Sequence, residues 1–216
     1  MPFQNECMKR FLIADDHAII RYAIRCILQE AFLDTHIEEV NDAEDLLQKV
    51  LSEKWDVVIT DISMPGKSGL EILQQIRRTH PKLPVLVLSI HPEEIYAVRV
   101  MKAGGSGYIR KDTAMQDLVK AVKDVLQGKK YIPPSIAEQL VYSLENDSAA
   151  IPHENLSDRE FEIMKLLASG VSLTDISNRL SLGITTISTY RARIMVKLHL
   201  KTNADLMHYA LSHKLL

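Results

Sequence analysis

Within the first 130 residues, short apolar runs alternate with stretches that have the length and periodicity of amphipathic helices. Three of the runs are apolar throughout, as in strands that are buried on both faces of a parallel sheet, and two are weaker. The five runs cover residues 11–14, 36–40, 57–60, 85–88 and 107–109. The helix-length stretches cover residues 17–31, 42–53, 69–79, 92–103 and 113–127. This alternation predicts an α/β fold with a doubly wound, five-stranded parallel sheet and right-handed crossovers.

The chain changes character after the α/β region, which we assign to residues 1–128. Residues 129–152 combine Pro133 and Pro134 with the polar stretch Glu145-Asn-Asp-Ser-Ala-Ala-Ile-Pro152, as in a linker, and a short helix is expected there over about 134–144. Further on we find no strand pattern, but three polar residues stand three positions before an acid, an arrangement that caps helix N-termini. These three are Ser157, Ser172 and Thr202. With another helix over 184–198, we predict that residues 153–216 form a small all-α domain.

The composition excludes several classes of protein. Of 216 residues, 46% are hydrophobic and 25% charged, which provides a folded core and argues against disorder as the main state. No apolar run approaches the roughly 20 residues of a membrane helix, and the start lacks a signal peptide's apolar stretch, so we expect a cytoplasmic protein without membrane contact. Cys7 and Cys26 are too few for a disulfide framework or a zinc site. We interpret both as thiols, and Cys26 as a core residue of a helix.

The charges are distributed unevenly. Residues 1–130 hold 18 Lys and Arg against 19 Asp and Glu, whereas residues 153–216 hold 8 against 6. Between Ile176 and Ala204 there are five basic residues and no acid. Such a basic stretch is what a nucleic-acid surface needs, although a solvated helix face has the same composition.

Acidic residues follow two of the predicted strands. Asp15 and Asp16 end the first strand and Asp61 ends the third, and in a doubly wound sheet these strands are neighbours at the edge where ligands bind. Three carboxylates that close repel one another, and a divalent cation with oxygen ligands, Mg²⁺, relieves the repulsion. Lys111 after the fifth strand and Ser89 after the fourth add an ammonium and a hydroxyl. The set suits phosphoryl transfer to a carboxylate.

These marks, with Asp61-Ile-Ser-Met-Pro-Gly66 and Gly107-Tyr-Ile-Arg-Lys111, resemble the flavodoxin-like receiver domain of bacterial response regulators over roughly residues 8–128. The resemblance implies that Asp61 is the phosphoacceptor. It also implies a Mg²⁺ site whose ligands are Asp15, Asp16, Asp61 and the main-chain carbonyl of Ser63. Lys111 then holds the phosphoryl oxygens. Ser89 and Tyr108 become a switch pair, in which Ser89 moves to the new phosphoryl group and Tyr108 turns inward.

The chain departs from many receivers after the lysine, where Asp112 replaces a proline, so the usual cis peptide is in doubt. Ser63 and His91 occupy positions that tune dephosphorylation in the family. Because Pro92 follows it, we interpret His91 as a residue at the start of a helix.

The C-terminal region has the spacing of a helix-turn-helix. On its second helix Ile187, Ile194 and Leu198 form an apolar stripe. Five short sequence motifs in residues 153–214 resemble the LuxR-type DNA-binding domain of the NarL/FixJ class. They are Leu156-Ser-Asp-Arg-Glu160, Asp175-Ile176, Leu180-Ser181-Leu182, Thr186-Ile187-Ser-Thr-Tyr-Arg191 and Lys197-Leu198.

This second resemblance implies two sets of DNA contacts. Base-facing positions are Thr185, Ser188, Thr189 and Ala192, and backbone contacts are Arg191, Arg193 and Lys197. Many members of the class have Lys at 185 and 171, Ser at 183 and Gly at 199, where this chain has Thr185, Val171, Gly183 and His199. Two missing cations weaken the sequence-independent part of DNA affinity, so we expect weak binding by a monomer. Position 199 is one where the backbone is expected to be left-handed.

Together the two resemblances predict a transcription regulator rather than an enzyme. A sensor histidine kinase phosphorylates Asp61, and the receiver supports its own Mg²⁺-dependent phosphorylation and dephosphorylation. The phosphorylated chain is expected to form a homodimer on promoter DNA, since paired half-sites multiply affinity.

Three alternatives stay open at this point. The first is a haloacid-dehalogenase-type phosphatase, although its second Asp is replaced here by Ser63. The second is a regulator that ignores phosphate and works by protein contact or constitutive dimerisation. The third is a DNA-independent scaffold, which the atypical Val171, Thr185 and His199 would suit.

Overall fold

The computed structural model divides the chain into two compact units, Met1–Tyr142 and Ser143–Leu216. It describes residues 8–64, 69–91, 93–133, 136–137, 152–213 and 215–216. Most of the helix that we predicted over 134–144 lies outside these residues, as do Cys7, Pro65, Gly66 and Pro92. The predicted domain boundaries at residues 128 and 152 stay predictions. No helix in the described part of the chain combines the length and hydropathy needed to cross a membrane.

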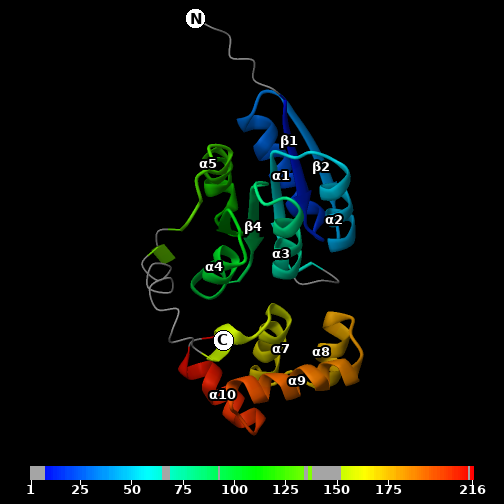
Figure 1. Ribbon diagram of the computed structural model, residues 1–216, viewed down its shortest axis with the longest axis vertical. Helices are drawn as coiled ribbons and strands as arrows, with labels where there is room; N and C mark the ends of the chain where they lie inside the picture. Colours follow the sequence, from blue (N-terminus) through cyan, green and yellow to red (C-terminus); the bar gives the residue numbers. More distant parts are fainter. Residues whose placement is uncertain (1–7, 65–68, 92, 134–135, 138–151, 214) are drawn as a thin grey trace, which may run out of the picture. The chain divides into compact units, whose positions relative to one another are not determined.

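The first unit is built on a parallel sheet of five strands in the order β2-β1-β3-β4-β5 (Figure 1). The strands are β1 (Lys9–Ala14), β2 (Thr35–Val40), β3 (Val57–Asp61), β4 (Val85–Ser89) and β5 (Gly107–Arg110). The helices are α1 (Ala18–Ala31), α2 (Ala43–Ser52), α3 (Gly69–Thr79), α4 (Glu93–Lys102) and α5 (Ala114–Leu126). The doubly wound α/β prediction is confirmed, and each predicted element is present within one residue or two of its predicted bounds.

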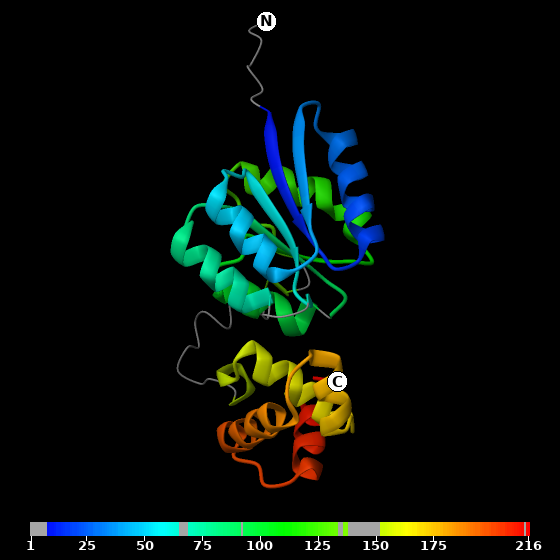
Figure 2. The same ribbon diagram turned by 90° about the vertical axis from the view of Figure 1, so that its right-hand side faces the viewer.

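The helices cover both faces of this sheet. Helix α1 packs beside α5, and α2 packs beside α3 on the other face (Figure 2). Every residue of β3 and β4 is buried, and residues 57–59 and 85–88 of these strands are apolar runs, as expected for strands covered on both faces. Edge strand β2 is mostly half-buried, and its polar residues explain why it was a weak strand signal.

The main core lies between the sheet and the pair α1 and α5. Ile24 and Leu28 of α1 are almost fully buried there, together with Phe11 of β1 and Leu118 of α5. Cys26 was expected in this core, but the structure contradicts that prediction because its side chain is exposed. It lies two residues from both Ile24 and Leu28, about 200° around the helix, and therefore faces away from the sheet.

The second unit is all-helical, as predicted, and contains α7 (Asp158–Ala168), α8 (Leu173–Leu180), α9 (Ile184–Leu198) and α10 (Asn203–Ser212) after a 3₁₀ turn, Pro152–Asn155. Ser157 and Thr202 form complete capping boxes, with Glu160 and Asp205 respectively. The oxygen of Ser172 accepts a hydrogen bond from the amide of Asp175. The short helices thus begin where local hydrogen bonds satisfy free N–H groups.

Helix α9 is oriented by its apolar stripe. Ile187 and Ile194 are fully buried and Leu198 is 4% exposed, so the predicted core face is confirmed. The helix ends at His199, whose φ of 57° is left-handed, as its position predicted. Ser181, which ends α8, has φ of 51°. Both residues adopt a conformation that favours glycine.

Candidate functional site

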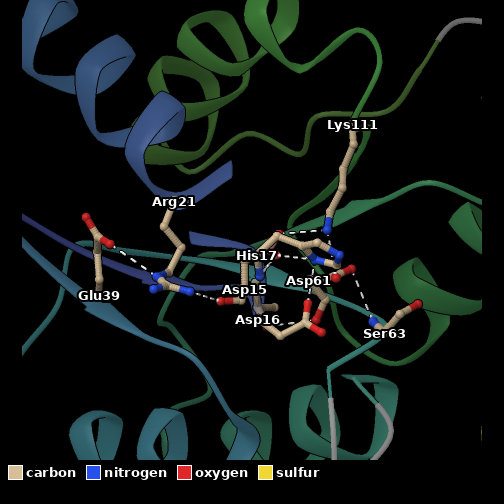
Figure 3. A network of polar contacts seen from close by, with 9 residues as sticks. Asp15, Asp16, His17, Arg21, Glu39, Asp61, Ser63 and Lys111 are labelled. Atoms are coloured by element: carbon tan, nitrogen blue, oxygen red, sulfur yellow. Dashed lines mark hydrogen bonds and ion pairs between the residues drawn. The ribbon is translucent and has the colours of Figure 1, made fainter. Parts of the chain in front are cut away.

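The carboxyl ends of β1 and β3 bring the acidic residues together. Ala14 pairs with Thr60 in the parallel register, so Asp15 and Asp61 follow side by side (Figure 3). Asp15 is fully buried and Asp61 is 2% exposed, whereas Asp16 lies at the surface. Sequence reasoning therefore placed these three side chains correctly at one edge of the sheet.

Lys111 joins the two buried carboxylates. Its Nζ lies 2.7 Å from Asp15 Oδ2 and 2.7 Å from Asp61 Oδ2. Burial alone would lower the pKa of the ammonium, but its bonds to Asp15 and Asp61 raise that pKa above its ordinary value. Burial raises the pKa of Asp61, and the bond from Lys111 acts in the opposite direction. Lys111 therefore stays cationic and holds one oxygen of the proposed phosphoacceptor.

The loop after β3 presents its backbone to Asp61. The amide of Ser63 donates a hydrogen bond to Asp61 Oδ1 over 3.1 Å. Gly69 closes this loop, since its amide donates to the carbonyl of Ile62 and a Cβ at residue 69 would lie 2.6 Å from Ile62 Cα. The close approach of two backbones requires glycine here and fixes the position of Ser63.

Two further side chains that sequence reasoning assigned no role support the turn after β1. Arg21 donates from Nη1 to the main-chain carbonyl of Asp15, and its Nε pairs with Glu39 Oε2 at 3.1 Å (Figure 3). His17 Nδ1 lies 2.6 Å from Asp16 Oδ1 and 3.1 Å from Asp15 Oδ1. Arg21 lies five residues after Asp16 in the sequence, but its partner on β2, Glu39, is known only from the tertiary structure.

This donor set fits a divalent cation. One ligand atom from each of Asp15, Asp16, His17 and Asp61 can be chosen so that all lie within 4.8 Å of one another. Carboxylate oxygens of this density repel unless a cation neutralises them, and oxygen ligands with room for water suit Mg²⁺. The residues present therefore match the metal that the sequence predicted.

The predicted switch residues lie on β4 and β5. Ser89 is fully buried, and its oxygen accepts a hydrogen bond from the amide of His91. Tyr108 is also fully buried, and its hydroxyl donates to the carbonyl of His91 over 2.8 Å. Burial raises the pKa of Tyr108 to about 12, so this hydroxyl stays protonated at neutral pH. The inward position expected of Tyr108 after phosphorylation is already its position here.

His91 precedes α4, which begins at Glu93, and its side chain makes two contacts of its own. Its Nε2 lies 3.2 Å from Ser63 Oγ, and its ring stacks on Tyr96 at 4.6 Å between centroids. The imidazole thus links the loop after β4 to the loop after β3, a contact that the sequence alone did not reveal. Among the described residues no peptide bond is cis, so the Lys111–Asp112 bond is trans.

The second candidate surface is the outer side of α9. The four predicted base-facing residues, Thr185, Ser188, Thr189 and Ala192, are all exposed. Of the three predicted backbone contacts, two are held within their own unit. Arg191 Nε donates to Asn203 Oδ1 over 2.8 Å, and Lys197 Nζ lies 2.6 Å from Glu160 Oε2. Arg193 is exposed.

Comparison with known proteins gives consistent results for both halves of the chain. A family described as response regulator receiver domain matches residues 11–123, and one described as bacterial regulatory proteins, luxR family, matches residues 154–210. Response regulator UvrY of Escherichia coli K12 is 34% identical over 209 residues, which cover 96% of each chain. Oxygen regulatory protein NreC of Staphylococcus epidermidis RP62A is 35% identical over 215 residues, covering 96% of this chain and 99% of that one.

Solved structures show the same architecture. RcsB of Salmonella enterica serovar Typhimurium, bound to promoter rprA in the presence of phosphomimetic BeF3-, is 28% identical with a TM-score of 0.60, covering 94% of this chain and 99% of that one. A structure of two RcsB dimers on two parallel DNAs is 30% identical with a TM-score of 0.56, covering 95% and 99%. The chain therefore belongs to the NarL/FixJ family of response regulators, in which a receiver domain precedes a LuxR-type DNA-binding domain.

Proposed function

We propose that phosphorylation of Asp61 switches this response regulator between a resting form and a form that binds promoter DNA as a dimer. The observation that carries the proposal is the buried Asp61 carboxylate, with Lys111 on one oxygen and the Ser63 amide on the other. These donors are placed to bind oxygens of a phosphoryl group as negative charge develops on them.

The phosphoryl donor is a phosphohistidine of a sensor histidine kinase or a small phosphodonor. A carboxylate oxygen of Asp61 attacks phosphorus, the bond from phosphorus to the donor breaks, and the donor leaves with the bonding electrons. Asp15, Asp16, Asp61 and the Ser63 carbonyl would hold Mg²⁺, which supplies positive charge to the phosphoryl oxygens when bound. Lys111 neutralises the same oxygens from the other side. The receiver thereby supports its own phosphorylation. Dephosphorylation is the attack of water on the same phosphorus, which breaks the bond to the Asp61 oxygen and releases inorganic phosphate.

The switch passes through the segment between β4 and α4. A phosphoryl group on Asp61 adds acceptor oxygens that attract the hydroxyl of Ser89 and the ammonium of Lys111. Movement of Ser89 shifts His91, whose amide is bonded to Ser89 and whose carbonyl holds Tyr108. Phosphorylation therefore acts on one connected set of hydrogen bonds and on helix α4 that follows it.

The output is DNA binding by α9, in the compartment that holds the chromosome, the bacterial cytoplasm. A single helix of this size buries little surface on DNA, so a dimer on paired half-sites supplies the affinity. The RcsB complexes with DNA support this assignment, since the match to them covers 94% and 95% of this chain.

The test measures the mass of the full chain by light scattering and its affinity for promoter fragments, with and without beryllofluoride and Mg²⁺. We expect beryllofluoride to produce dimers and tighter DNA binding in the natural chain, but not in Asp61→Asn or Asp61→Ala. If all three proteins dimerise and bind DNA equally, the receiver is a fixed dimerisation module and the phosphate-independent regulator is the better interpretation.

A further inference from the structure

The outward face of α9 is a ridge of methyl groups. Thr185, Thr189, Ala192 and Val196 are all exposed, Val196 by 73%. They are spaced by four, three and four residues, so they stand above one another along one side of the helix. This side is opposite the buried stripe that faces the rest of the unit. We call these four residues the methyl ridge.

The hydroxyl proton of Thr189 is already used inside the helix. Its Oγ1 donates to the main-chain carbonyl of Thr185 over 3.0 Å. Thr189 therefore has no hydrogen-bond donor left for a base edge and offers its γ-methyl group. Ala192, one turn further on the same face, offers only a methyl group.

The amide and carboxylate side chains that read adenine and cytosine through hydrogen bonds are missing from this helix. Residues 184–198 contain no Asn, Gln, Asp, Glu or His. Two of the three cationic side chains in this range bind other residues of the same unit: Arg191 donates a hydrogen bond to Asn203, and Lys197 donates one to Glu160. Arg193, beside Thr189 in a shallow hollow at the surface, is the cation left to reach DNA in the described part of the helix.

In the major groove, thymine is the base that presents a methyl group, and Ala and Thr methyl groups recognise it by apolar contact. We propose that Thr189 and Ala192, the two central residues of the methyl ridge, read thymine 5-methyl groups. The ligand is thus a duplex whose half-site has thymines at the contacted positions. The inference rests on the proposed function, because it requires α9 to lie in the major groove. Burying one methyl group contributes about 0.8 kcal/mol, or about fourfold in affinity.

The experiment begins with the full chain, beryllofluoride and Mg²⁺, and a library of duplexes with a randomised centre. Duplexes that are enriched are then made with thymine or with deoxyuridine, which lacks only the methyl group, and affinities are compared by fluorescence anisotropy at one salt concentration. We expect affinity to fall about fourfold for each contacted thymine that is replaced. Deoxyuridine outside the enriched motif is the control and is expected to change nothing.

Variants of Thr189 distinguish the contribution of its methyl group to the thymine preference from that of its hydroxyl group. Thr189→Ser keeps the hydroxyl and is expected to lose part of the preference for thymine over deoxyuridine. Thr189→Val keeps the methyl and is expected to retain that preference. Val196→Ala removes methyl groups about 10 Å further along the helix, beyond the N-terminal part that contacts bases, and is expected to retain it too.

Two results would overturn the inference, and they are distinguishable. Equal affinity for thymine and deoxyuridine duplexes, with a motif still enriched, refutes the methyl readout and leaves the DNA-binding function intact. If no duplex is enriched with or without beryllofluoride, the proposed function fails and the inference fails with it.

Discussion

The two units of this protein build their functional surfaces in opposite ways. The receiver site collects Asp15, Asp61 and Lys111 from strand ends that are 46 and 50 residues apart, and it buries their charges. The surface of α9 comes from residues of one helix that face water. Removing one residue from a site of buried charges leaves the remaining charges without their partner. Removing one residue from an exposed helix surface removes only the contact that this residue makes. Equivalent mutations in the two units are therefore expected to differ in size.

The largest effect is expected for Lys111→Met. This change leaves two buried carboxylates unpaired and close together, and breaking such an arrangement costs about 3 kcal/mol. We expect the first unit to lose about that much stability without metal and to recover part of it in Mg²⁺. Urea unfolding followed by Trp55, the single tryptophan, reports this unit alone.

The matched change in the second unit is Lys197→Met. Lys197 also pairs with a buried carboxylate, Glu160, but its own side chain is 39% exposed. After the change, water can reach the Glu160 carboxylate from the side that Lys197 occupied. We therefore expect the free energy of unfolding of the second unit to fall by at most about 1 kcal/mol, as measured by circular dichroism. A loss equal to that of Lys111→Met would refute the contrast between the two units.

The next largest effect is expected for Arg21→Ala. The variant removes a charged donor from the carbonyl of Asp15 and leaves Glu39 with Arg25 as its ion-pair partner. Hydrogen bonds of this kind contribute about 2 kcal/mol. We expect a comparable loss of stability together with weaker Mg²⁺ binding in calorimetry. Arg21→Lys keeps the charge and is the control, and a normal Mg²⁺ affinity in Arg21→Ala would contradict the positioning role.

A smaller effect of opposite sign is expected at the end of α9. His199 has a left-handed backbone, which costs a residue with a Cβ about 1 kcal/mol relative to glycine. His199→Gly is therefore expected to stabilise the second unit by about that amount. Ser181→Gly, at the end of α8, is the parallel test, and thermal unfolding measures both. A loss of stability in both variants would show that neither backbone is strained.

The smallest effect is a dependence on pH. Burial alone would raise the pKa of Glu160, but Lys197 and the capping contacts with Ser157 outweigh it and lower this pKa below its ordinary value of 4.5. The stabilisation is therefore complete above about pH 4.5 and is lost as the pH falls through the lower, folded-state value. In Glu160→Gln, the stability of the second unit is expected to lose the part of its pH dependence that comes from protonation of Glu160. An unchanged acid transition would exclude Glu160 as its source.

Much of this protein could be predicted from the sequence because its signals are local. Buried strands such as β3 and β4 begin with runs of apolar residues, and helices such as α7 begin at side chains that accept hydrogen bonds from the free amides of the first turn. Strand ends in a parallel sheet meet at one edge, so the position of Asp61 next to Asp15 also followed. The error at Cys26 arose because a helix side is set by the apolar stripe and not by the preference of one residue type.

The sequence by itself determined the fold class, the order of the two units and the residues at the strand ends, since periodicity and capping depend on near neighbours. Only the tertiary structure decided how charged side chains are shared. It paired Lys197 with Glu160, Arg21 with Glu39 and Ser63 with His91. These partners are 18 to 37 residues apart, and no local pattern encodes them. A long polar side chain can reach many positions, and packing alone selects the one that it contacts.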